Sequence, residues 1–71
     1  MQYLVVIEKG DSSYGAYVPD LPGCVAAAGS ETEVRQLIRE AIEFHIEGLR
    51  EHGEPVPVPN SSSAIVEVGA A

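Results

Sequence analysis

Three short apolar runs separated by turn-forming residues occupy the first 28 positions of the chain. The run at residues 3–7 is apolar on both of its alternating sides, which is typical of a central strand covered on both faces. Residues 14–18 follow a turn-rich connection, so these two runs predict a β-hairpin. Residues 24–28 predict a third short strand.

The hydrophobic pattern changes to a helical period after Gly29. Ser30 suits an N-cap position, and Glu33, three residues later, completes a capping box. The apolar spacing then predicts a helix of about five or six turns, with one packed stripe and one solvated face. Gly53 suits the left-handed position after a helix, and Pro55 prevents the helix from continuing.

A polyproline-like linker at residues 56–63 leads to a last predicted strand at residues 64–68. Because strand–helix–strand crossovers are right-handed, this strand is expected to lie parallel beside the first. The chain therefore predicts a single α+β domain over residues 1–71, of βββαβ order, with a small sheet and one helix packed on one face. Phe44 and Ile46 widen the apolar stripe of the helix, which indicates a second covering surface.

An elbow between the second and third predicted strands contains two prolines and a glycine. Pro19 and Pro22 restrict φ, and Gly23 permits backbone conformations and close approaches that other residues disfavour, so we expect a rigid structural turn. Asp20 has two possible roles. It either caps the turn through its carboxylate or presents a charge to a basic partner.

The charge balance of the chain favours a basic partner over nucleic acid. The formal net charge is -7, with only four Lys and Arg residues, so the cations that neutralise phosphates are scarce. A domain of 71 residues is also marginal alone, which favours self-association. Cys24 is the only cysteine and is expected to be a buried apolar residue. No signal peptide or membrane-spanning run is recognisable, so we expect a cytoplasmic protein.

The sequence contains no recognisable set of catalytic residues. The acidic residues lie mostly on one helix face or singly in turns, whereas a metal-dependent nuclease gathers several carboxylates around its ions. His45 falls within the apolar stripe and is expected to be a core histidine, and His52 is expected to meet the carbonyls at the helix end. We predict no catalytic residue, no cofactor and no metal ligand.

These motifs together resemble the HicB family of antitoxins. The resemblance rests on residues 17–24 (YVPDLPGC), Gly29 with Thr32 and Glu33, residues 40–42 (EAI), and Gly53 followed by three alternating prolines. It implies a partial ribonuclease-H-like domain without that fold's catalytic acids. It also implies that the chain binds and blocks a HicA-like toxin, a small basic ribonuclease that cleaves messenger RNA.

We therefore predict an antitoxin-type binding protein that acts by occlusion and charge complementarity and is not an enzyme. It is expected to form a dimer or tetramer and to make no direct contact with nucleic acid or membrane. An orphan homo-oligomeric or ligand-binding module is the alternative, followed by a residual metal-dependent nuclease. The acidic helix face is either a solvated surface or a partner-binding one. The candidate partner-binding residues are Asp20, Leu21, Glu43, Glu47 and Glu51.

Overall fold

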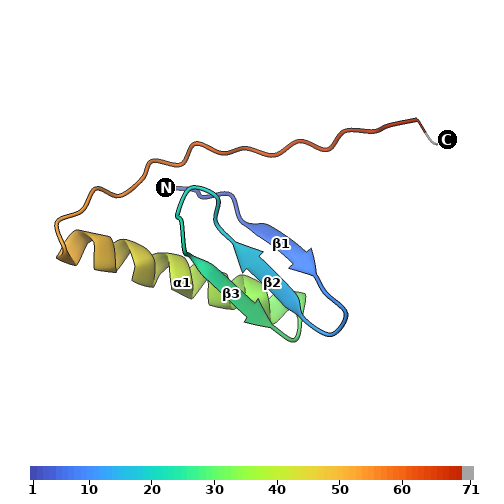
Figure 1. The fold of residues 1–71 in the computed structure, drawn as a ribbon, viewed down its shortest axis with the longest axis horizontal. Helices are drawn as coiled ribbons and strands as arrows, with labels where there is room; N and C mark the ends of the chain where they lie inside the picture. The colour runs from blue at the N-terminus through green and yellow to red at the C-terminus, as the bar shows by residue number, and fades with distance from the viewer. Residues whose placement is uncertain (70–71) are drawn as a thin grey trace.

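Three antiparallel strands are followed by one long helix in the computed structural model, which describes residues 1–69 (Figure 1). The last two positions of the predicted domain lie outside the described residues. The sheet contains β1 (Val6–Lys9), β2 (Tyr14–Tyr17) and β3 (Val25–Ala28) in the order β1-β2-β3. The helix α1 spans Glu31–Glu51. The predicted α+β class, with three strands before one helix, is confirmed.

The register of the strands divides the sheet into two different faces. Ile7 lies opposite Ala16, which lies opposite Ala26, and this row packs beneath α1. On the other face Val6 lies opposite Tyr17, which lies opposite Val25. The core lies between the sheet and the helix because only the first face is covered. Its buried members are Ala16, Val18, Leu21, Cys24, Val34 and Ile38.

Both ends of α1 are closed by the residues that the sequence indicates. The Ser30 hydroxyl oxygen accepts a hydrogen bond from the Glu33 backbone N–H at 3.2 Å, as expected of an N-cap. At the other end Gly53 has a φ of 69°. Its N–H donates to the Arg50 carbonyl, and the Glu54 N–H donates to the Leu49 carbonyl. These two bonds form a Schellman motif, which satisfies carbonyls that the helix leaves unpaired.

The elbow consists of two consecutive turns that overlap at Leu21. The Leu21 N–H donates to the Val18 carbonyl and the Cys24 N–H donates to the Leu21 carbonyl, both at 3.0 Å. Pro22 and Gly23 are the central residues of the second turn, and Gly23 has a φ of 85°. Space around Gly23 is open, since no atom lies within 4 Å of an added Cβ. The positive φ therefore explains why glycine occupies this position, and a close approach of another backbone segment does not.

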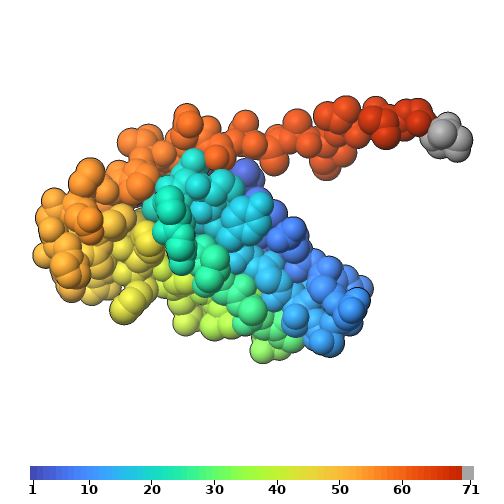
Figure 2. Space-filling model, in the orientation of Figure 1, coloured from blue at the N-terminus to red at the C-terminus, as the bar shows by residue number. Residues whose placement is uncertain are grey.

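The strand predicted at residues 64–68 does not form. Within the described part of the chain, residues 54–69 contain no strand and run as an extended tail that projects beyond the sheet (Figures 1 and 2). The Tyr3 hydroxyl donates to the Pro57 carbonyl. Both the Asn60 N–H and the Ser61 N–H donate to Oδ2 of Asp20 at 2.9 Å. These contacts hold the start of the tail at the elbow, and beyond them the tail and β1 diverge (Figure 1).

Asp20 is therefore an anchor for the tail. In addition to the two backbone donors, the Ser61 hydroxyl donates to Oδ1 of Asp20 at 2.8 Å. Hydrogen bonds from Asn60 and Ser61 hold the pKa of the Asp20 carboxyl below its usual value, because they favour the charged form. One role expected of this carboxylate, a cap of its own turn, is therefore wrong: the carboxylate instead accepts hydrogen bonds from residues 40 and 41 positions away.

Acidification is expected to release the tail from the elbow. The pKa of Asp20 is lowered in the folded state, so its charged carboxylate stabilises that state fully at a pH above the ordinary carboxyl pKa. This stabilisation is lost as the pH falls through the lowered pKa of the folded state. The amides of Asn60 and Ser61 should lose their hydrogen-exchange protection as the pH falls below the ordinary range of a carboxyl pKa. Asp20→Ala should remove that protection at neutral pH, whereas Asp11→Ala should leave it intact. Protection that persists in Asp20→Ala would contradict the anchor.

Substitution of Gly23 is expected to destabilise the fold through backbone strain. Gly23→Val should lower the free energy of unfolding by at least about 1 kcal/mol, because a β-branched residue is strained at positive φ. Gly29→Ala is the matched control, since Gly29 also has open space around it but no positive φ. Urea unfolding of both variants measures the difference. Equal midpoints for the two variants would show that the turn tolerates side chains.

Candidate partner-binding surface

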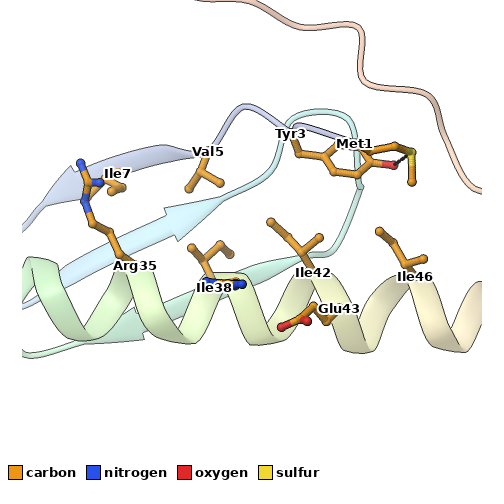
Figure 3. Close-up of a pocket in the computed structure, with 10 residues that line it drawn as sticks. Met1, Tyr3, Val5, Ile7, Arg35, Ile38, Ile42, Glu43 and Ile46 are labelled. Carbon is orange, nitrogen blue, oxygen red and sulfur yellow. Dashed lines mark hydrogen bonds between the residues drawn. The ribbon is translucent and has the colours of Figure 1, made fainter.

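An apolar groove lies between the first residues of the chain and α1. The helix packs chiefly against β3 and β2, so the side of the sheet that carries β1 is less completely covered. Tyr3, Val5 and Ile7 point toward the helix, and Ile42 and Ile46 point back toward them (Figure 3). The groove has a volume of about 540 Å³. Its walls are thus aliphatic and aromatic, with charged residues at the rim.

A row of glutamates follows the same side of the helix. Glu43, Glu47 and Glu51 are spaced four residues apart, and together with Ile46 and Arg50 they line a shallow depression next to the groove. Like charges at this spacing repel each other by a few tenths of a kcal/mol per pair, so the row does not stabilise the helix. In the chain from residue 1 to 69, the Arg35–Glu31 contact at 3.1 Å is the only salt bridge. The glutamate row therefore remains available to an external cation.

The structure separates the predicted partner-binding residues into two places. Glu43, Glu47 and Glu51 come together on α1 and are all exposed. Asp20 lies on the elbow, where the tail engages its carboxylate. Leu21 has no exposed surface and belongs to the core, so its side chain cannot contact a partner. The glutamate row is the part of the predicted site that the structure leaves free.

The β1 side of the groove is a feature that the sequence prediction of the site missed. The central strand predicted at residues 3–7 is wrong, because β1 begins at Val6 and lies at the edge of the sheet. The apolar character of residues 3–7 on both sides was nevertheless a usable signal, since Tyr3 and Val5 line the groove. Ile46, one of the two residues that widen the helix stripe, lines the groove. The other, Phe44, is 79% exposed and lies outside it.

The other potentially reactive side chains occupy positions that indicate structural roles. Cys24 is buried, and its burial raises the pKa of the thiol, which disfavours the nucleophilic thiolate. Nδ1 of His52 lies 2.7 Å from the Gly48 carbonyl oxygen, as the sequence predicts for the end of the helix. Among residues 1–69 no group of three or more His, Cys, Asp or Glu side chains is arranged to hold a metal ion.

The helix is not a candidate for a membrane span. Within the described residues, no helix combines the length and the apolar character needed to cross a bilayer.

Proteins from phage, archaea and bacteria share much of this sequence. A 14.9 kDa protein of Haemophilus phage HP1 is 43% identical over 60 residues, which are 84% of this chain but 45% of the phage protein. The chain thus spans less than half of that relative. A UPF0150 protein of Thermoplasma acidophilum is 39% identical over 67 residues, covering 93% of this chain and 97% of its own length.

A solved structure shares the fold. A chain of a HicA3 and HicB3 toxin–antitoxin complex superimposes with a TM-score of 0.72 and 32% identity, over 84% of this chain and 70% of the other. The sequence model of the HicB-like antitoxin of bacterial toxin–antitoxin systems matches residues 3–69, a range that includes the elbow, the helix and the tail. The chain therefore belongs to the HicB-like antitoxin family.

Proposed function

We propose that this protein neutralises a basic HicA-like ribonuclease by covering its surface and complementing its charge. The observation that carries the proposal is the row of exposed glutamates on α1, namely Glu43, Glu47 and Glu51. Its family and its likeness to a chain of a HicA3 and HicB3 complex support a toxin as the partner. The same proposal places the protein in the cytoplasm and gives it no catalytic role of its own.

The two parts of this surface act on different steps of binding. An acidic inhibitor and a basic RNA-binding enzyme attract each other at long range, which accelerates their encounter. Each exposed ion pair contributes only about 0.2 to 1 kcal/mol to affinity. Apolar contacts near the row exclude water and slow dissociation. The glutamates therefore govern the association rate, and neighbouring apolar side chains govern the lifetime of the complex.

The chain is also proposed to act as a homo-oligomer. Large apolar side chains remain exposed on three different parts of the molecule, namely β3, the helix and the tail; examples are Val25, Phe44 and Ile65. A domain of 71 residues buries little apolar surface on folding. Large apolar side chains left in water are therefore unfavourable for a domain of this size. Association of two or more copies would cover part of this surface.

Removal of the glutamate charges is expected to slow toxin capture. A Glu43→Gln, Glu47→Gln, Glu51→Gln variant should associate with a purified HicA-like toxin about tenfold more slowly than the wild type at low salt, because it loses long-range attraction. The difference should shrink at high salt, where charges are screened. Stopped-flow kinetics at two ionic strengths measures both effects.

A charge-matched control distinguishes the effect of the glutamate row on the association rate from the effect of net charge alone. Glu8→Gln, Asp11→Asn, Glu54→Gln makes the same change in total charge at exposed sites away from the row. It should slow association less than the helix variant does. If both triple variants associate equally fast, or if the wild-type rate is indifferent to salt, the glutamate row is not the capture surface.

Purified protein is expected neither to cleave RNA nor to bind operator DNA. In the described part of the chain no group of three or more His, Cys, Asp or Glu side chains is arranged to hold a metal ion, and the net charge of -7 opposes contact with phosphates. Incubation of labelled RNA with the protein and Mg²⁺ or Mn²⁺ tests the first statement, and a salt-dependent DNA-binding titration tests the second. Metal-dependent cleavage that is lost in Asp11→Asn or Asp20→Asn would identify a nuclease instead.

A further inference from the structure

The sheet has two edge strands, β1 and β3, and the β1 edge lies beside the apolar groove. In the order β1-β2-β3, β1 pairs with β2 on one side only, and no other strand occurs in residues 1–69. The outward-facing N–H and C=O groups of such an edge can pair with any extended segment. The free edge therefore offers a row of backbone hydrogen bonds.

The apolar groove lies directly beneath this edge. Val5 and Ile7 enter it from the β1 side, and Ile38, Ile42 and Ile46 enter it from α1 (Figure 3). A strand added to β1 would place every second side chain into the groove, because side chains alternate between the two faces of a sheet. The edge and the groove are therefore complementary to one strand with an apolar face.

The tail contains a segment that could form such a strand. Residues 64–68 read Ala-Ile-Val-Glu-Val, which is rich in β-branched residues. The side chains of Ile65, Val66 and Val68 are 104%, 76% and 79% exposed, and residues 62–69 make no hydrogen bond to the rest of the described chain. An extended apolar segment left fully in water needs a surface to cover it.

We propose that residues 64–68 of one copy pair with the free edge of β1 in a second copy, and that Val66 and Val68 fill its groove. The alternation of the strand supports this orientation, because Glu67 then points away from the apolar walls. Two copies exchange their tails reciprocally in a closed dimer. The inference deepens the self-association proposed above, and the exchanged tail supplies the fourth strand of the βββαβ order.

The anchored start of the tail favours a second copy over the chain's own β1. Asp20 and Tyr3 hold residues 57, 60 and 61, and beyond these contacts the tail diverges from β1 (Figure 1). A return to the chain's own edge would require the tail to bend toward the sheet beyond its anchors, away from the course that it takes in Figure 1. A neighbouring molecule accepts the tail without breaking the anchors. The glutamate row stays at the rim, where it remains free for a toxin.

Photo-crosslinking of the full chain tests the exchange directly. Val66 is replaced by the photoreactive residue benzoylphenylalanine, and the products are separated by mass and mapped by peptide analysis. We expect crosslinks between chains, joining position 66 to residues 3–7 or to residues 38–46 of another copy. Crosslinks to those residues within a single chain would overturn the exchange, as would crosslinks only to other surfaces.

Light scattering of full-chain variants distinguishes this interface from other modes of association. Val66→Asp with Val68→Asp should raise the dimer dissociation constant at least about 100-fold, since charged groups cannot occupy the groove. Phe44→Glu is the control, because Phe44 is equally exposed but lies outside the groove. It should leave the dimer intact.

The possible outcomes separate this inference from the proposed self-association. A monomeric wild-type protein at all micromolar concentrations would overturn both. A dimer that survives the double valine substitution would overturn strand exchange alone. Circular dichroism is expected to show an unchanged helix in that variant, because the side chains of Val66 and Val68 are 76% and 79% exposed in their own chain.

Discussion

The packing of α1 against small side chains of the sheet determines how the rest of this molecule is arranged. Val34 and Ile38 are buried against alanines of β2 and β3, and a fully buried aliphatic side chain stabilises a fold by about 1.5 to 3 kcal/mol. Small partners allow the helix to approach these two strands closely. The β1 side carries larger residues and stays open. Both the groove and the glutamate row beside it follow from that off-centre position.

The local chemistry of the sequence was sufficient to predict most of the fold. Ser30, Gly53 and the two prolines of the elbow act through their own backbone conformation or through partners a few residues away, and each lies where it was expected. The prediction of a last strand at residues 64–68 was wrong for the isolated chain. A strand needs a neighbouring strand, and the composition of these residues does not indicate where that neighbour lies. Strand propensity is a property of the segment itself, whereas strand pairing depends on the other strands of the whole assembly.

The site was less predictable than the fold, for a related reason. The helical spacing of Glu43, Glu47 and Glu51 places them together without any tertiary information. Leu21 was misjudged because an elbow tip is usually exposed, yet here the two overlapping turns direct this side chain into the core. The role of Asp20 was also beyond local analysis, since its hydrogen-bond donors lie 40 and 41 residues away.

The placement of the tail after all other elements has a consequence for proteolysis. All three strands and the helix are complete by Glu51, and residues 60–69 are exposed. Exposed terminal segments are preferred sites of proteolytic cleavage. A cut within residues 60–69 would therefore leave the three strands and the helix joined and the core intact.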